Sequence, residues 1–361
     1  MLKTAFTAET QRHRAKPIKP KNLDVSVSLC LSVLFLVAGC GQEPLYQQQS
    51  FVFGTQVEIT IADADSVQAR TASAAVLQEF DRLHQAFHAW KPSPVTNLNA
   101  AFARGERLQV SPELATAIRT ATRYAEASDN LFNPAIGRLI ALWGFQSDEF
   151  KPVVPPPEQI QALLQANPRM RDISVDAAGW ASSSNRAVQL DFGGYAKGLA
   201  LDRALTILRA HGIRHALVNV GGNVIALGRH GKRLWHVGVQ HPRRVGAILE
   251  LDLQDGEAIG TSGDYQRYFE LDGRRYCHII DPRSGYPAQQ AQSLTVLAGA
   301  GAEAGLQSDI ASKPAFIVGG NGWEAYLQRL GIEAAMLVDE SGKMAMTKIL
   351  AKRAHWVRQA N

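Results

Sequence analysis

Residues 261–287 read TSGDYQRYFELDGRRYCHIIDPRSGYP, a stretch dense in turn residues, carboxylates and aromatic side chains. Its middle predicts a β-hairpin, because the alternating residues 268–271 lead into Asp272-Gly273, a strong turn signal. The return strand, predicted over 275–280, brings His278 to a loop that prolines and a glycine make rigid. The hydroxyls and amides of 261–264 predict a turn that can meet an anion. The stretch alone fits two interpretations: a well-made hairpin with polar tips, or a ligand site whose histidine exchanges a proton near neutral pH.

Two further segments place a Gly-Gly pair directly after an apolar run. Residues 189–202, QLDFGGYAKGLALD, predict a short strand, a turn at Gly193-Gly194 and a helix with Lys197 in its first turn. Exposed amides and a lysine at the start of a helix suit a phosphate. Residues 218–224, VNVGGNV, repeat the pattern, so a second backbone segment can approach a ligand closely. Neither has the spacing of a P-loop or of the dinucleotide-binding glycine fingerprint, so an ordinary nucleotide fold is not supported.

The remaining chain mixes predicted strands with predicted helices. Hydrophobic periodicity predicts strands over 55–61, 215–220, 235–240, 247–253 and 334–338, and helices over 66–87, 111–127, 157–165, 199–211 and 323–330. Strands that follow one another with helices between them indicate an α+β fold.

Together, and in this order, these segments resemble the FAD:protein FMN transferases of the ApbE family. The resemblance extends over the turn at 53–55, residues 87–90, FNPAIGRLIALWG at 132–144, and 309–319. It implies a two-lobed α+β fold with mixed or antiparallel sheets flanked by helices, spanning residues 51–350, with 351–361 as a C-terminal tail. The implied reaction cleaves FAD, releases AMP and attaches FMN through a phosphoester to a threonine or serine of an acceptor protein. By the same resemblance, the acceptor belongs to a flavin-dependent electron-transfer complex.

The resemblance also implies roles for individual residues. The expected FAD contacts are Phe53, Trp90, Asn130, Leu131, Phe132, Asp191, Lys197 and Ile280. His278 is the candidate for proton transfer, and Asp281 either orients it or holds the turn. The expected Mg²⁺ position involves the Gly194 carbonyl and the Asp309 carboxylate, with Ser312 and Lys313 at the end of the same segment. Magnesium prefers such hard oxygen ligands.

Three residues depart from the family pattern near the expected cation. Lys313 stands where the family usually has a threonine ligand, and a protonated ammonium cannot ligate a metal. Asn223 and Asn133 stand where acidic residues are common, so each removes a negative charge. Two alternatives to the transferase therefore stay open: a noncatalytic FAD-binding lipoprotein, and a magnesium-dependent FAD pyrophosphatase that releases free FMN and AMP.

The first 39 residues are predicted to be a signal peptide. A basic leader precedes an apolar run at 25–38 that is too short to cross a bilayer comfortably. The run ends in Val37-Ala38-Gly39-Cys40, which resembles a bacterial lipobox with Cys40 as the lipidated residue. Residues 40–50 are then expected to be a polar linker. The protein is expected to face the periplasm, and Gln42 rather than aspartate after Gly41 fits the outer membrane.

Composition limits the choice of partners. The formal net charge is +5, but the first 39 residues hold six basic and two acidic side chains, so 32 basic and 31 acidic ones remain. A nearly neutral body argues against a nucleic-acid-binding protein. After the leader and Cys40, Cys277 is the remaining cysteine, and its place in a strand predicts a packed thiol.

Overall fold

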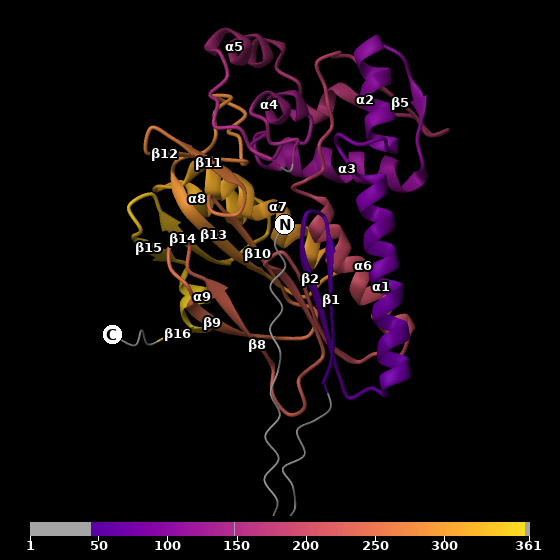
Figure 1. The fold of residues 1–361 in the computed structure, drawn as a ribbon, viewed down its shortest axis with the longest axis vertical. Coiled ribbons are helices and arrows are strands. Elements are labelled where there is room, and N and C mark those ends of the chain that lie inside the picture. Colours follow the sequence, from indigo (N-terminus) through magenta and orange to yellow (C-terminus); the bar gives the residue numbers. More distant parts are fainter. Residues whose placement is uncertain (1–44, 148, 358–361) are drawn as a thin grey trace, which may run out of the picture. The chain divides into compact units, whose positions relative to one another are not determined.

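A sheet of eight antiparallel strands forms the core of the fold (Figure 1). The computed structural model describes residues 45–147 and 149–357. In sheet order the strands are β1 (Leu45–Val52), β2 (Thr55–Ala62), β6 (His215–Val220), β7 (Asn223–Leu227), β10 (Ala258–Gly263), β13 (Ala291–Ala298), β14 (Ala334–Asp339) and β15 (Met344–Met346). The sheet joins segments far apart in the chain, since β2 pairs with β6 and β7 pairs with β10.

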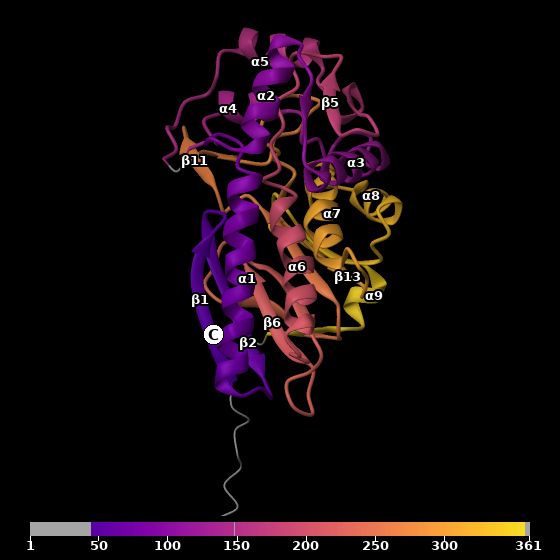
Figure 2. The ribbon, with the colours of Figure 1, turned by 90° about the vertical axis from the view of Figure 1, so that its right-hand side faces the viewer.

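Both faces of this sheet are covered. The helices α1 (Ser66–Ala86), α6 (Ala196–Ala210) and α7 (Ala304–Val318) lie over one face (Figure 2). A second sheet of β16 (Ala354–Trp356), β9 (Ala247–Leu253) and β8 (Trp235–Gln240) lies on the other. Successive residues of a strand point to opposite faces, so Leu337 enters the core under the helices and Met336 the core between the sheets. For the same reason β7 is buried along its whole length.

The remaining elements gather mainly around one end of the large sheet (Figure 1). They are α2 (Pro94–Arg104), β3 (Leu108–Gln109), α3 (Pro112–Ala127), α4 (Gly137–Leu142), α5 (Pro157–Ala166), a 3₁₀ turn (Met170–Asp172), β4 (Ile173–Val175) and β5 (Trp180–Ser183). The hairpin of β11 (Tyr268–Leu271) and β12 (Arg274–Cys277) packs there by stacking Phe269 and Tyr276 against Trp143. Helices α8 (Trp323–Arg329) and α9 (Lys348–Ala351) flank β14 in the chain.

Helices α6 and α7 cross with almost no space between their backbones. A Cβ atom added to Gly198 of α6 would lie 2.6 Å from the Gly305 carbonyl oxygen of α7, and one added to Gly305 would lie 2.7 Å from the Gly198 carbonyl oxygen. Neither helix has a side-chain cap from its own N-cap residue. Instead, Asp309 Oδ2 of α7 accepts from the Gly198 N–H at 3.0 Å, and Asp202 of α6 accepts from the Gly305 and Leu306 N–H groups at 2.7 and 2.9 Å. Each helix thus satisfies the free amides of the other.

The α+β class and most predicted elements are confirmed, and the sheets are antiparallel throughout the described chain. Strands β8, β9 and β11 have the predicted bounds, and the predicted helices over 66–87, 111–127 and 157–165 agree with α1, α3 and α5 within a residue. The predicted turn at 261–264 was wrong for its first three residues, which end β10. The strand expected at the start of 189–202 is a single isolated bridge between Gln189 and Ile136.

The predicted domain limits were too narrow at both ends. Residues 45–50 were expected in a polar linker, yet they belong to β1, whose polar side chains alternate along an exposed edge. Residues 354–356 were expected in a tail, yet they form β16 on the edge of the second sheet. The predicted signal peptide, Cys40 and residues 40–44 lie outside the described residues. Within the described ranges, no helix is both long and apolar enough to span a bilayer.

Substituting alanine at the α6–α7 crossing tests how tightly it is packed. Alanine normally favours a helix over glycine by about 1 kcal/mol, yet we expect Gly198→Ala to lower the free energy of unfolding by about 1–3 kcal/mol, because its methyl group meets backbone atoms. Denaturant unfolding measures the effect. Gly299→Ala is the matched control, since a Cβ there meets nothing within 4 Å. Equal stabilities for the two variants would contradict the close crossing.

Candidate functional site

One large cavity gathers most of the residues that the sequence singled out. Its volume is about 1290 Å³, above the range of roughly 300–1,000 Å³ that small-molecule pockets commonly have. Its walls come from the β1–β2 turn, the end of α1, the loops at 131–136 and 191–197, strand β8, the connection at 265–267, residues 278–280 and one side of α7. The cavity therefore depends on elements from almost the entire described chain.

One part of the cavity wall carries two lysines around a buried carboxylate. Lys313 Nζ lies 2.6 Å from Asp309 Oδ1 and 2.6 Å from the Asp309 carbonyl oxygen, one turn earlier on α7. Lys197, at the start of α6, lines the same wall. Gly194 also belongs to it, and a Cβ there would lie 2.5 Å from Lys313 Cε, so the lysine stem packs directly on the glycine backbone.

These charges shift one another. Burial opposes ionisation of Asp309, but the ammonium groups of Lys313 and Lys197 and its hydrogen bonds hold the pKa of the Asp309 carboxyl below its ordinary value. Burial lowers the pKa of the Lys197 ammonium; Asp309 opposes this shift, and Lys313 and Arg267 add to it. Two cations beside one carboxylate leave this wall with an excess of positive charge, which suits an anionic ligand.

His278 lies in the same cavity and is held in its neutral form. Burial is the main cause that lowers the pKa of His278, to about 3, and the charges of Arg267 and Lys197 lower it further. Its Nδ1 lies 3.2 Å from the Arg267 carbonyl oxygen. A carbonyl oxygen only accepts, so Nδ1 carries the proton and Nε2 keeps a lone pair that can accept another.

Aromatic side chains and a guanidinium form another wall. Phe53 occupies the β1–β2 turn with φ +57°, and its ring contacts the ring of His84. The guanidinium of Arg267 lies 5.9 Å from the ring centre of Trp90 and donates to the carbonyl oxygens of Phe145 and Ser147. Flat rings and a planar cation suit a ligand with extended aromatic groups.

The Gly193-Gly194 turn is held by a neighbouring carboxylate. Asp191 Oδ1 accepts from the Gly193 N–H at 2.8 Å, and Asp191 Oδ2 accepts from Gln146 Nε2 at 3.0 Å. Asp191 is buried, so these bonds fix the turn that leads into α6. Lys197 is thereby presented to the cavity from the first turn of the helix.

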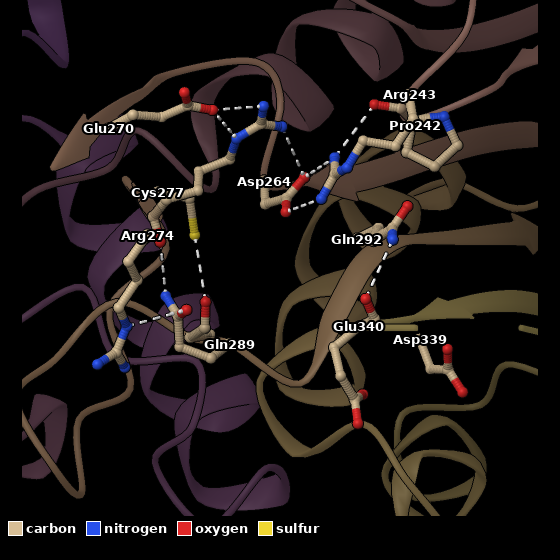
Figure 3. Close-up of polar contacts among 12 residues, drawn as sticks. Pro242, Arg243, Asp264, Glu270, Arg274, Cys277, Gln289, Gln292, Asp339 and Glu340 are labelled. Atoms are coloured by element: carbon tan, nitrogen blue, oxygen red, sulfur yellow. Dashed lines mark hydrogen bonds and ion pairs between the residues drawn. The ribbon is translucent and has the colours of Figure 1, made fainter. Parts of the chain in front are cut away.

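The connection that carries Tyr265, Gln266 and Arg267 into the cavity is anchored from outside. Arg243, in the β8–β9 loop, donates to both carboxylate oxygens of Asp264, at 2.7 and 2.5 Å (Figure 3). Cys277 closes the hairpin side by directing its thiol to the Ala288 carbonyl oxygen at 3.6 Å. Burial raises the pKa of the Cys277 thiol to about 12, which confirms the prediction of a packed, unreactive cysteine.

The structure brings together most, but not all, of the predicted site residues. The cavity is lined by Phe53, Trp90, Leu131, Phe132, Asp191, Gly194, Lys197, His278, Ile280, Asp309 and Lys313. Asn130 does not line it, and its backbone instead ends the turn after α3. Asp281 does not orient His278: its carboxylate binds Arg283, and its backbone closes the turn to Tyr286. The alternative role for Asp281, holding the turn, is the one the geometry supports.

The residues at the expected magnesium position do not fit that ion. Asp309 Oδ1 already accepts a hydrogen bond from Lys313 Nζ, and Asp309 Oδ2 accepts one from the Gly198 N–H. Ser312, predicted as a ligand, is turned toward β10, where its hydroxyl lies 2.8 Å from that of Ser262. In the ranges that the structure describes, no three His, Cys, Asp or Glu side chains are grouped so that they could hold a metal ion.

The two asparagines that stand where acidic residues were expected form hydrogen bonds with backbone groups. Asn223 is buried behind the cavity wall, where its side-chain oxygen accepts from the Thr261 N–H, while its amide nitrogen has no partner in the described structure. Asn133 bonds the Pro168 carbonyl oxygen and the Ala135 N–H. Neither amide supplies the negative charge that a divalent cation needs.

Three cavity residues were missed or misread in the sequence. Arg267 was missed because a single arginine just before a predicted hairpin carries no distinguishing pattern. His84 and His88 are not among the predicted site residues, yet both line the cavity. His88 is buried, and its Nδ1 accepts from the Lys91 N–H at 3.1 Å, which sets the loop that carries Trp90. Their i,i+4 spacing just before Trp90 was the available signal.

Comparisons with known proteins agree with this geometry. Residues 53–336 match the ApbE family. A curated FAD:protein FMN transferase of Rhodobacter capsulatus is 37% identical over 316 residues, which cover 86% of this chain and 58% of that protein. One from Treponema pallidum is 31% identical over 294 residues, covering 75% of this chain and 80% of that protein.

Solved structures show the same fold. The structure of the ApbE protein from Thermotoga maritima superposes with a TM-score of 0.78 at 32% identity, covering 86% of this chain and 99% of that one. The flavinyl transferase ApbE of Pseudomonas stutzeri gives 0.72 at 28% identity, with coverages of 86% and 97%. The α+β fold of this chain is thus the fold of solved flavin transferases. The chain belongs to the ApbE family.

The depressed pKa of His278 predicts how stability depends on pH. Above the ordinary pKa of about 6.5 the imidazole is neutral in both the folded and the unfolded chain. Below it only the unfolded chain takes up the proton, so folding loses up to about 1.4 kcal/mol per pH unit until the folded pKa of about 3 is reached. We expect His278→Gln to remove this loss. The free energy of unfolding of the variant, measured by denaturant titration, should therefore rise relative to that of the wild-type protein as pH falls from 6 to about 4.

His236→Gln serves as the control of opposite sign. Hydrogen bonding to Asp252 is the main cause that raises the pKa of His236, so its contribution to stability is present at low pH and is lost as pH rises. The free energy of unfolding of this variant should therefore fall relative to that of the wild-type protein as pH falls to about 6.5, above the range in which that of His278→Gln rises. If the free energies of unfolding of His278→Gln and of the wild-type protein depended on pH in the same way, the result would contradict a buried, neutral His278.

Proposed function

We propose that this chain transfers FMN from FAD to a hydroxyl of an acceptor protein, the activity named for its curated relatives. The observation that carries the proposal is the meeting, in one cavity, of two lysines and an arginine with a neutral histidine. The cations suit the pyrophosphate of FAD, and the histidine is in the state needed to accept a proton. The size of the cavity leaves room for a dinucleotide and for an acceptor side chain.

The proposed step exchanges one phosphorus–oxygen bond for another. The hydroxyl oxygen of the acceptor threonine or serine attacks the phosphorus on the riboflavin side of FAD, while its proton passes to Nε2 of His278. The bond from that phosphorus to the bridging oxygen breaks, and AMP leaves with this oxygen and the electron pair. The products are a phosphodiester between FMN and the acceptor, AMP, and one proton that His278 later releases.

Different residues of the cavity would bind the rings and the phosphates of FAD. Phe53, Trp90 and the guanidinium of Arg267 offer flat surfaces for the rings of FAD. Lys197 and the Gly193-Gly194 turn face the phosphates, where positive charge opposes the charge that develops on the leaving oxygen. The bound pyrophosphate would offset the nearby cations and so raise the pKa of His278 toward the working pH. No step is assigned to a divalent cation, because the residues at its expected position do not fit one.

Replacing His278 separates binding from transfer. We expect His278→Gln to lower the rate of FMN transfer by about 10²–10⁴-fold, the usual contribution of a general base, and to leave FAD affinity within about threefold. Intact-mass analysis of the acceptor measures transfer, and quenching of flavin fluorescence measures binding. His355→Gln, on an exposed strand, is the control and should keep full activity. Full transfer activity of His278→Gln would contradict the role of His278 as the proton acceptor.

The same assay distinguishes the two alternatives. A mass increase of the acceptor equal to FMN, with an equivalent amount of AMP, supports the transferase. Free FMN and AMP without a modified acceptor indicate an FAD pyrophosphatase. Bound, uncleaved FAD indicates a carrier. We further propose that the acceptor is a subunit of a flavin-dependent electron-transfer complex, which the resemblance to the family suggests.

We also propose that Cys40 is lipidated and tethers the protein to the bacterial envelope, facing the periplasm at the outer membrane. The support is the basic leader, the apolar run and the Val37-Ala38-Gly39-Cys40 sequence. Two or three acyl chains on one residue anchor durably, because each buried methylene contributes about 0.8 kcal/mol.

Labelling with a palmitate analogue tests the tether. The wild-type chain should carry the label and sediment with membranes. Cys40→Ser should lose the label and leave the membrane fraction, while Cys30→Ser, within the predicted signal peptide, should retain both properties. Label that persists in Cys40→Ser would exclude this cysteine as the anchor.

A further inference from the structure

Lys313 occupies the place where a site for an anionic dinucleotide would be expected to hold a metal cation. Its ammonium is bonded to the carboxylate and to the carbonyl oxygen of Asp309, both at 2.6 Å. Its stem packs against the backbone of Gly194, whose carbonyl was the other expected ligand. The structure thus places a protein cation on the carboxylate that was expected to bind a magnesium ion, with the stem of that cation against the residue expected to supply the second ligand.

The position of this ammonium is well constrained. The side chain of Asp309 is 2% exposed and that of Lys313 is 17% exposed, so the pair is largely shielded from water. The second oxygen of Asp309 is tied to the Gly198 N–H, within the crossing of α6 and α7. Lys313 therefore cannot draw Asp309 toward a different partner without disturbing the crossing.

Lysine and magnesium would compete for the same oxygen. Magnesium needs ligand oxygens at about 2.0–2.1 Å in a nearly octahedral shell. An ammonium already on Asp309 Oδ1 would face that ion at close range, and two cations in a poorly hydrated site repel each other strongly. The charge of the Asp309 carboxylate is already balanced by Lys313, with Lys197 beside it.

The ammonium also has bonding capacity left for a ligand. A lysine carries three N–H donors, and Asp309 accepts two of them from Lys313. Lys313 lines the cavity, so its third donor can reach a phosphate oxygen there. Lys197 lines the same wall, and neither a hydrogen bond nor an ion pair joins its ammonium to another described residue.

We propose that Lys313 acts as the built-in cation of this site, binding the pyrophosphate of FAD directly, so that this chain binds and cleaves FAD without a divalent metal ion. The inference rests on the proposed function for its substrate. Lys313 keeps its proton throughout, and it stabilises the oxygen that leaves with AMP in the transfer described above. Asp309 is a positioning residue that orients the ammonium.

FAD binding by the full chain in detergent, with and without a chelator, tests this directly. For the wild-type protein we expect the FAD dissociation constant, from flavin fluorescence, to agree within about twofold in EDTA and in Mg²⁺. Transfer to the acceptor should also persist in EDTA. Loss of FAD binding or of transfer by the wild-type protein in EDTA would overturn the proposal, and this comparison needs no variant.

Two substitutions of Lys313 separate its charge from its shape. Lys313→Thr supplies a hydroxyl oxygen and frees Asp309, so we expect FAD affinity to fall at least about tenfold in EDTA, as for a lost charge-assisted hydrogen bond, and to recover in Mg²⁺. Lys313→Met keeps the length of the side chain but supplies neither charge nor oxygen, so its affinity should fall similarly and not recover. Wild-type affinity of both variants in EDTA would refute the role of Lys313.

The outcomes distinguish this inference from the proposed function. Metal-independent FAD binding without any transfer would contradict the transferase and leave the cation role of Lys313 standing. Transfer that requires Mg²⁺ would support the transferase and contradict the cation role. Thermal unfolding of each variant with and without FAD confirms that it is folded before its affinity is compared.

Discussion

The exchange of caps between α6 and α7 is the interaction on which the site depends. Asp309 satisfies an amide at the start of α6, and Asp202 satisfies two at the start of α7. The crossing is possible only because Gly198 and Gly305 have no side chains at the contact. It fixes the first turn of α6, and with it the Gly193-Gly194 turn and Lys197, against the residues of α7. A carboxylate that serves as a helix cap is thereby also the central charge of the cavity.

The charges of the cavity form one coupled set. Asp309 stays ionised despite burial because Lys313 and Lys197 lie beside it. Burial and these same cations keep His278 neutral. An apolar cavity would not hold a pyrophosphate, and a cavity with cations alone would lack a group to take up a proton. The described arrangement provides both properties, and in the proposed transfer the bound pyrophosphate would reduce the positive field that adds to the effect of burial on His278.

Local patterns identified the segments that approach the ligand, because the relevant signals lie within a few residues. Asp272-Gly273 between alternating residues identified β11 and its turn, and FGGYAKG identified the start of α6. Elements whose signal is a distant partner were missed. Strand β1 reads as a polar linker because it is exposed on one face, and β16 is a strand only because β9 lies beside it. The sequence 261–263 reads as a turn, yet pairing with β13 extends it into β10.

The same division holds for the chemistry. Short motifs in the sequence indicate the family pattern, the pairing of glycines with Lys197, the candidate base His278 and the unusual Lys313, because each is a residue type recognisable from its neighbours. Tertiary structure decided which of these residues meet. It placed Arg267 over Trp90, turned Ser312 and Asp281 away, and set the ammonium of Lys313 on Asp309. Direction and distance between side chains depend on how α6, α7 and the hairpin pack, and no local pattern contains that information.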